Sequence, residues 1–264
     1  MTAFEGGPGL VARGASIAVA GRRLVADVDL ALRPGELVAV VGRNGAGKST
    51  LLRLLAGLHR TASGEVRLDG RPLAALAPGE RARRLGFLAP AGLPVPAGFV
   101  VREVVGWSRF AHGDWWRSTG VDDPAVERAL AGLELTGLAD RRIDSLSDGE
   151  RARVWLAALV AQETDYVLLD EPTSHLDAAH AADGLRTIRS WARAGRAVAV
   201  VLHDLDAALA AADRIVLVAD GRIALDRAVG LVSIDELGRW LGVRLAEVAL
   251  DGRRRVLARS GGAG

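Results

Sequence analysis

The most constraining feature of this 264-residue chain is a glycine-rich run, residues 42–50 (GRNGAGKST), which contains Lys48, the only lysine in the sequence. The run fits the pattern G-x-x-x-x-G-K-[ST], in which backbone N–H groups surround a phosphate and the lysine reaches the β- and γ-phosphates. A compact ammonium on a flexible stem fits such a loop, whereas the planar guanidinium of arginine replaces it poorly. Because lysine occurs only here, the sequence indicates a phosphate-binding loop.

The segments on either side of this loop predict the secondary structure that a nucleotide site requires. Residues 37–41 (LVAVV) have the apolar character of a buried strand, and residues 51–55 (LLRLL) are typical of a helix. A helix that begins at the loop points its positive N-terminal end at the anion, and the Ser49 hydroxyl can then bind Mg²⁺. A glycine-rich surface turn that matches by chance is the alternative. We predict nucleotide binding by Gly42, Asn44, Gly45, Ala46, Gly47, Lys48, Ser49 and Thr50.

Composition excludes several classes of protein. Half of the residues are hydrophobic, yet no apolar run approaches the ~18 residues of a membrane span, and the first residues show no secretion signal. The absence of cysteine excludes disulfides, Cys-type zinc sites and thiol catalysis. The formal net charge is only +2, and the arginines are dispersed rather than gathered with aromatics as nucleic-acid binding would need. We expect a cytoplasmic protein that binds no nucleic acid.

The order of apolar runs predicts an α/β fold with a parallel sheet. Two β-like runs precede the phosphate loop, and buried strands that alternate with helices resume at residue 166. Between these parts, residues 89–98 hold three prolines and two glycines, and the segments that follow read as helices at 101–109, 124–133 and 150–162. The tail at 234–259 reads as a helix, a β-like run and a basic turn at 251–255. We predict a single domain over residues 1–264, with a nucleotide-binding core at 1–88 and 165–264 and a helical insertion at 89–164.

An acidic pair follows one of the predicted strands. Residues 166–169 are apolar and lead directly into Asp170 and Glu171. A carboxylate at the end of a buried strand beside a phosphate loop can hold Mg²⁺ through its waters. A second acid can orient or deprotonate the attacking water, which contributes ~10²–10⁴-fold in rate. Acids that simply carry a strand into a turn give the same pattern, so the assignment of Asp170 to the metal and Glu171 to the water depends on the phosphate loop.

A third segment, residues 145–150 (SLSDGE), lies between the phosphate loop and the acidic pair and precedes a predicted helix. Serine, glycine and a helix N-terminus make an anion-receptive site, although alone they are only a good N-cap. In this order, the three motifs resemble those of the ATP-binding-cassette (ABC) ATPases, whose signature reads Leu-Ser-Gly-Gly-Gln. Residues 170–177 resemble the D-loop of that family, and His203 resembles its switch histidine. The resemblance covers about residues 35–225.

The resemblance implies the P-loop NTPase (RecA-like) fold, with an N-terminal antiparallel β subdomain and an inserted helical subdomain. It also implies a dimer of two copies that encloses two ATP molecules. Lys48 and Glu171 of one copy would face each ATP, with Mg²⁺ beside them, and Ser147 and Gly149 of the other copy would complete the site. His203 would contact the γ-phosphate or the water. A lone buried histidine is usually a satisfied core residue, but the position of His203 at the end of a β-like run, 33 residues after Asp170, favours the functional role.

Two departures from the family pattern concern the nucleotide's surroundings. Pro90 stands where the family has a glutamine that meets Mg²⁺ and relays the nucleotide state to the membrane partner, and proline has no side-chain donor or acceptor. The aromatic that stacks on adenine aligns with Val19 or Ala20. Weaker apolar contact would replace stacking there, unless Arg22 or Arg23 covers the ring.

A third departure lies in the signature, where Asp148 and Glu150 replace glycine and glutamine. Asp148 adds a negative charge near a triphosphate, beside a helix N-terminus that tolerates it. Together the departures predict slower or less tightly coupled hydrolysis, with ATP binding intact.

The transport system is indicated by residues 101–105 and 107–110, which resemble the corresponding segment in ATPases of iron–siderophore, haem and cobalamin importers. Aromatic residues gather here and just beyond, and large aromatics are common in interface cores. They would either meet the membrane permease or pack within the helical insertion, and the sequence favours neither. These residues are Trp107, Phe110, Trp115 and Trp116.

We therefore expect an importer ATPase that converts ATP to ADP and phosphate to power uptake of a ferric siderophore, haem or a similar metal complex. Its expected partners are a second copy of itself, membrane permease subunits and, indirectly, a periplasmic or extracellular substrate-binding protein. Its expected location is the inner face of the cell membrane. One alternative is an ATP-gated dimerising subunit with feeble hydrolysis, which Pro90 and Val19 favour. Another is a soluble ABC protein of ribosomes or DNA, although those usually carry two cassettes or a coiled-coil insertion.

Overall fold

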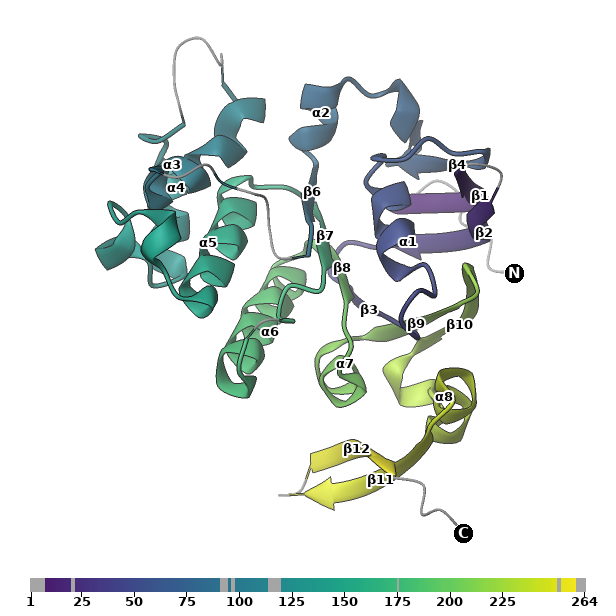
Figure 1. The fold of residues 1–264 in the computed structure, drawn as a ribbon. Helices are drawn as coiled ribbons and strands as arrows, with labels where there is room; N and C mark the ends of the chain where they lie inside the picture. The colour runs from purple at the N-terminus through teal and green to yellow at the C-terminus, as the bar shows by residue number, and fades with distance from the viewer. Residues whose placement is uncertain are drawn as a thin grey trace.

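The computed structural model describes residues 8–19, 22–90, 95, 98–113, 120–174, 176–250 and 253–259 of the chain (Figure 1). Several residues of the sequence analysis lie outside these ranges: Ala20, Trp115, Trp116, His175 and Asp251. The side chain of Arg22 is outside the description as well. In the part that is described, no helix is long and apolar enough to cross a membrane.

The centre of the fold is a six-stranded sheet with the strand order β10-β9-β3-β8-β7-β6. Neighbouring strands from β9 to β6 run parallel, and only β10 is antiparallel to its neighbour. The predicted parallel α/β sheet is therefore confirmed. The strands are β3 (Leu37–Val41), β6 (Leu85–Leu88), β7 (Tyr166–Asp170), β8 (Ala197–Val201), β9 (Arg214–Ala219) and β10 (Arg222–Ala228).

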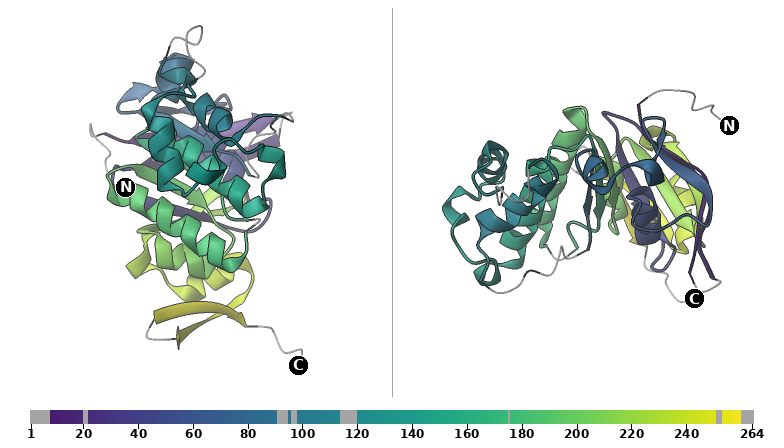
Figure 2. Two further views of the ribbon diagram at one scale, coloured as in Figure 1. Left: turned by 90° about the vertical axis from the view of Figure 1, so that its left-hand side faces the viewer. Right: turned by 90° about the horizontal axis from the view of Figure 1, so that it is seen from above.

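Alternate side chains of these strands enter two separate cores, because successive residues of a strand point to opposite faces of the sheet. One face packs against α1 (Lys48–Leu55) and the N-terminal sheet β2-β1-β4-β5. The other packs against α5 (Asp148–Ala161), α6 (Ala178–Arg193) and α7 (Leu205–Ala211). Figure 2 shows these layers from above. The strands of the N-terminal sheet are β1 (Leu10–Val19), β2 (Arg22–Leu32), β4 (Ser63–Leu68) and β5 (Arg71–Pro72).

The helical segment between β6 and β7 lies beside the open edge of the sheet, in teal in Figure 1. The predicted helix at 101–109 is an α-helix, α3 (Val101–Gly106), that continues as a 3₁₀ helix (Trp107–Ala111). The helix α4 (Pro124–Gly132) begins after Asp123, whose carboxylate accepts a hydrogen bond from the amide of Ala125. A short helix that the sequence reading did not include, α2 (Pro78–Ala82), leads into β6.

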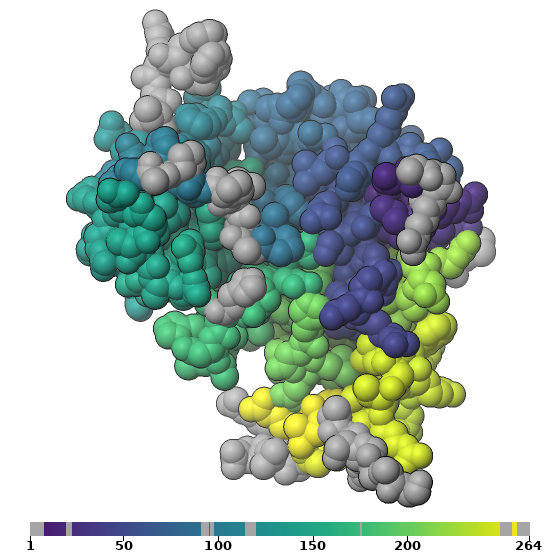
Figure 3. Space-filling view, viewed as in Figure 1, coloured from purple at the N-terminus to yellow at the C-terminus, as the bar shows by residue number. Residues whose placement is uncertain are grey.

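The C-terminal part consists of α8 (Ile234–Leu241) and a hairpin of β11 (Arg244–Leu250) and β12 (Arg253–Arg259). Residues 253–255, which we expected in a basic turn, instead begin strand β12 because they pair with β11. The hairpin is held to α7 by Asp206, whose carboxylate accepts hydrogen bonds from the amide of Val256 at 2.9 Å and from Arg255 at 2.5 Å. Figure 3 shows this part in yellow at one end of the molecule.

Candidate functional site

The predicted phosphate loop connects β3 to α1, and the loop residues named above lie between the end of that strand and the first turn of that helix. Gly42 has φ of 150°, and a Cβ atom at this position would lie 2.2 Å from the carbonyl oxygen of Val218. Any side chain at this position would displace strand β9. The loop therefore rests directly on the sheet, which holds its backbone in place.

Lys48 is the first residue of α1, and its side chain is 5% exposed. Its ammonium donates hydrogen bonds to the carbonyl oxygens of Gly42 at 2.9 Å and Arg43 at 3.1 Å, so it curls over the loop. Burial lowers the pKa of Lys48, while Glu171 and Asp170 nearby act in the opposite direction. A cation held among backbone amides in this way is suited to bind a polyphosphate.

The metal-binding prediction concerns Ser49 and Asp170, which the fold brings together from the first turn of α1 and the end of β7. The Ser49 hydroxyl donates a hydrogen bond to Oδ1 of Asp170 at 2.9 Å. Asp170 is 0% exposed, and burial raises its pKa. Within the described part of the chain, its Oδ2 atom has no hydrogen-bond partner. A buried carboxylate oxygen without a partner, beside a hydroxyl, offers the oxygen ligands that Mg²⁺ prefers. The residues present therefore fit this metal.

Glu171 and His203 also lie together, because Glu171 follows β7 and His203 follows its neighbour β8. In the sheet, β8 lies between β3 and β7. Asp170 pairs with Val201 in β8, and Val201 pairs with Val40 in β3, so the carboxyl ends of the three strands are level. This edge of a parallel sheet is where ligands of such folds bind. Here Nε2 of His203 lies 2.6 Å from Oε1 of Glu171. His203 is thus half-exposed and paired, rather than a buried core histidine.

The backbone of Glu171 has a left-handed conformation, with φ of 54°. Such a conformation costs a non-glycine residue about 1–3 kcal/mol and persists only where the surroundings hold it. Its carbonyl oxygen accepts hydrogen bonds from the amide of Ser174 at 3.3 Å and from the Ser174 hydroxyl at 3.1 Å. The turn thus aims the Glu171 side chain at His203 and away from the path of the strand.

The signature segment forms the N-terminus of α5. Ser147 and Glu150 make a capping box, in which the Ser147 hydroxyl accepts from the Glu150 amide at 3.2 Å and a Glu150 oxygen accepts from the Ser147 amide at 2.8 Å. The backbone hydrogen bond lowers the pKa of Glu150. Asp148 pairs with Arg151 one turn further along. The two acids that depart from the family pattern are thus accommodated within the helix itself.

Gly149 faces the N-terminal turn of α6. A Cβ atom at this glycine would lie 3.7 Å from the ring of His180, which in turn lies 2.8 Å from Oδ2 of Asp177. Asp177 is the N-cap of α6 and belongs to the segment that resembles the D-loop. The signature and the D-loop of one copy are therefore neighbours.

One copy of the chain does not join the two halves of the predicted site. Lys48, Ser49, Asp170, Glu171 and His203 converge at the carboxyl ends of the strands, and α1 packs on one face of the sheet. Ser147 and Gly149 begin α5, which packs on the opposite face among α3 and α4 (Figure 1).

The remaining predicted positions separate into exposed and packed residues. Val19 is 49% exposed at the end of β1, and Arg23 is exposed beside it. Trp107 packs edge-to-face against Phe99, with ring centroids 5.0 Å apart, whereas Phe110 is 48% exposed. Of the two alternatives for the aromatic residues, packing within the helical segment applies to Trp107. Phe110 lies on the surface of that segment.

Three functional features escaped the sequence analysis. The left-handed Glu171 has no sequence pattern, because glutamate rarely adopts this conformation. The contact of His180 with Gly149 is a tertiary contact. The capping box of Ser147 and Glu150 could have been found, because serine followed three residues later by glutamate before an apolar run is its known pattern.

Comparisons with known proteins show which chains this one is similar to. The family pattern described as ABC transporter matches residues 25–174. The chain is 47% identical over 207 residues to the hemin import ATP-binding protein HmuV of Nocardia farcinica (strain IFM 10152), covering 78% of this chain and 70% of that protein. It is 41% identical over 202 residues to the "Probable siderophore transport system ATP-binding protein YusV" of Bacillus subtilis (strain 168), covering 76% and 73%.

Among solved structures, the fold is similar to a chain of a protein described as a metal-chelate type ABC transporter in an inward-facing conformation. The TM-score is 0.81 at 24% identity, covering 96% of this chain and 98% of that one. At this identity the likeness concerns the fold, and it confirms the predicted P-loop NTPase class.

Proposed function

Because the chain belongs to the ABC transporter family of ATPases, we propose that it powers the import of haem, a ferric siderophore or a similar metal complex through a separate membrane permease. The family membership makes it an ATP-binding ATPase subunit of an import system. The cargo class rests on the names of the relatives, which are a hemin import protein and a siderophore transport protein.

One observation carries the catalytic part of the proposal: two polar pairs converge beside a buried lysine. Ser49 at the start of α1 meets Asp170 at the end of β7. Glu171 meets His203, which follows the adjacent strand β8. Lys48 lies over the phosphate loop beside both pairs. Phosphoryl transfer to water needs positioning and charge neutralisation rather than covalent chemistry. These five side chains supply both.

In the proposed reaction, a water oxygen attacks the γ-phosphorus, and the bond from that phosphorus to the β–γ bridging oxygen breaks. Lys48 and the backbone amides at the start of α1 hold the β- and γ-phosphates. Glu171 orients the water and accepts its proton, and His203 holds the carboxylate of Glu171 in place through the 2.6 Å contact. Mg²⁺, when bound by Ser49 and Asp170, neutralises charge on the phosphates.

The second copy of the chain would complete each site with Ser147 and Gly149, because these residues lie on a separate helix in one copy. The N-terminus of α5 presents the backbone amides of its first turn and a positive dipole end, which suit the γ-phosphate of the opposite copy. In this proposal, residues 1–88 and 165–264 form the ATP-binding core, and residues 89–164 form the helical subdomain that carries the opposing half-site.

The exposed Phe110 belongs in this proposal to the surface that meets the permease, because it is a large aromatic on the outside of the helical segment. The protein would then work at the inner face of the membrane, bound to permease subunits. An external substrate-binding protein would act with it only indirectly, through the permease.

The proposal is tested by steady-state ATPase activity of the purified protein and of Glu171→Gln, each alone and with its permease in lipid nanodiscs. We expect turnover that depends on Glu171 and rises with the permease, and uptake of haem or a ferric siderophore in reconstituted vesicles. An equally stimulated uptake of an unrelated cargo would contradict the cargo class.

A second candidate function is an ATP-gated regulatory subunit. It is favoured by Val19, which offers adenine an exposed aliphatic side chain instead of an aromatic ring. Tight ATP binding with negligible turnover in the presence of the permease would support this candidate and exclude the transport motor.

A further inference from the structure

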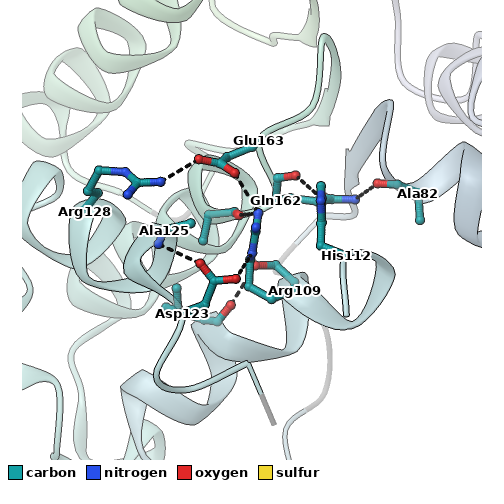
Figure 4. Close-up of polar contacts among 11 residues, drawn as sticks. Ala82, Arg109, His112, Asp123, Ala125, Arg128, Gln162 and Glu163 are labelled. Carbon is teal, nitrogen blue, oxygen red and sulfur yellow. Dashed lines mark hydrogen bonds and ion pairs between the residues drawn. The ribbon is translucent and has the colours of Figure 1, made fainter. Parts of the chain in front are cut away.

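At the C-terminal end of the signature helix, the side chain of Gln162 is hydrogen-bonded to the core of the fold. This residue is the C-cap of α5 and the only glutamine of the chain. Its Nε2 donates a hydrogen bond to the carbonyl oxygen of Ala82 at 2.8 Å, with a longer contact of 3.5 Å to the carbonyl oxygen of Leu85. These acceptors end α2 and begin β6, so Gln162 links the helical segment to the central sheet (Figure 4).

The backbone around Gln162 is also held by residues of the helical segment. Nε2 of His112 lies 2.9 Å from the carbonyl oxygen of Gln162, and Arg109 donates to the carbonyl oxygen of Ala161 at 2.7 Å. Arg109 also contacts Glu163 at 2.9 Å and Asp123 at 2.7 Å, as Figure 4 shows. These contacts fix the backbone at the end of α5 within the helical segment. The side-chain hydrogen bond of Gln162 then fixes this end of the helix relative to the core.

Close packing at Gly86 supports the same conclusion. A Cβ atom at Gly86, in β6, would lie 2.9 Å from Cδ2 of Leu159, 3.0 Å from Oγ1 of Thr164 and 3.1 Å from Oε1 of Gln162. The end of α5 thus approaches the strand so closely that even a methyl group would push it away. The contact works as a fixed pivot rather than as a loose surface contact.

The two ends of α5 carry the two functions of the helix. Ser147 caps its N-terminus and Gln162 its C-terminus, with 14 residues between them. A helix of this length is about 21 Å long, so a tilt of about 5° at the pivot moves the other end by about 2 Å. Hydrogen bonds to a phosphate fail over such a distance, and a misplacement of about 1 Å in an active site can cost about 10²-fold in rate.

We propose that Gln162 is a positioning residue for ATP hydrolysis, which sets the angle of α5 and thereby the place of Ser147 and Gly149 against the ATP of the opposite copy. This role rests on the proposed function, since it requires the ATP-bound dimer. At the other end of β6, Pro90 has no side-chain group that could make such a polar link. Gln162 therefore couples the central sheet to the signature helix.

The test uses ATP-dependent dimerisation of the full chain in the Glu171→Gln background, followed by analytical ultracentrifugation. Gln162→Glu keeps the shape of the side chain but replaces the donating amide by a carboxylate that repels the two carbonyl oxygens. Gln162→Ala removes the contact without adding charge. Arg83→Ala is the matched control, because Arg83 also joins the two parts, but through the carbonyl oxygen of Ala111 at 2.9 Å, which lies outside α5.

We expect both Gln162 variants to need at least fivefold more ATP for dimerisation than the parent, with the ATP affinity of the monomer unchanged within twofold, and with Arg83→Ala resembling the parent. In the background with Glu171 intact, kcat should fall while KM for ATP measured at low protein concentration rises. Gln162 variants that melt at a lower temperature yet dimerise like the parent would reduce the residue to a structural role. A parent that stays monomeric with ATP would overturn the dimer mechanism itself, together with this role.

Discussion

The two halves of the proposed ATP site differ in how completely one copy of the chain builds them. In the core half, Lys48 and Asp170 are 5% and 0% exposed. Lys48 is held by carbonyl oxygens of its own loop, and Asp170 by the Ser49 hydroxyl of α1. In the signature half, Ser147 is exposed and Gly149 is partly exposed, and the polar partner of Ser147 is Glu150 of the same helix turn. One half is therefore complete after folding, and the other is finished only when a second copy arrives.

ATP therefore acts on two separate free energies: that of its binding to the core half, and that of engagement of the signature half of the second copy. Binding to the core half pays little ordering cost, because its side chains are already in place. Engagement of the signature half orders an exposed surface and brings in a second copy of the chain. We therefore expect dimer formation to be the step that depends on bound ATP. Substitutions in the core half should therefore change ATP binding by the monomer, whereas those in the signature half should not.

The largest effect is expected for Lys48→Ala, which should weaken ATP binding to the monomer by about 10–100-fold. Loss of charge-assisted hydrogen bonds to phosphate costs about 1.5–3 kcal/mol. The matched variant Ser147→Ala should leave this affinity unchanged, because Ser147 belongs to the other half. Isothermal titration with Mg-ATP at protein concentrations below dimerisation compares the two. A loss of monomer affinity in Ser147→Ala would break the distinction between the halves.

A smaller effect is expected for Asp170→Asn, which should raise the melting temperature of the nucleotide-free protein by a few degrees at pH 7. Burial raises the pKa of Asp170, so the folded state disfavours the carboxylate, and stability falls as pH rises through the folded pKa. Asparagine removes this charge and keeps an oxygen for the Ser49 hydroxyl. About 1 kcal/mol corresponds to about 2–4 °C in a chain of this size.

The advantage of Asp170→Asn should shrink as pH falls towards 3.8, the ordinary pKa of an aspartate, and vanish below it, where the wild-type carboxyl is protonated in both states. Differential scanning fluorimetry across pH 3–8 measures it, and the same variant should lose Mg²⁺-dependent ATPase activity. A lower melting temperature at pH 7 would mean that the positive charges of Arg53 and Lys48, which act against the effect of burial, outweigh it.

The smallest effect is expected for Glu150→Ala, which should lower the melting temperature by about 1–2 °C at pH 7 through loss of the capping box. The pKa of Glu150 is depressed by the Ser147 amide, so this stabilisation is present above the unfolded pKa and disappears as pH falls through the folded pKa. Glu150→Gln should retain the cap, since glutamine also closes a capping box. Equal melting temperatures for Glu150→Ala and wild type would show that the exposed half needs no internal support.

Much of the core half was accessible from the sequence, because it is built from local patterns. Buried strands appear as apolar runs, and the glycine loop, Asp170, Glu171 and His203 each follow one of them. Parallel strands place such ends at one edge, so the convergence of Ser49 with Asp170 followed from the topology.

The features that were missed depend on contacts between distant segments or on backbone strain. Gln162 appeared only as the end of a helix, and its attachment to Ala82 spans 80 residues of sequence. The left-handed backbone of Glu171 results from its turn and has no preference in the residue type. The misplaced basic turn at residues 253–255 reflects a hairpin whose pairing outweighs the local charge of three arginines.

The buried position of Lys48 has a consequence for proteolysis. A lysine-specific protease has one peptide bond to cut in this chain, between Lys48 and Ser49, and that bond lies in the first turn of α1. Cleavage there requires the turn to unwind, so its rate follows the population of the opened loop. The rate at which the two fragments appear thus reports how often the phosphate loop opens, and no label is needed to detect them.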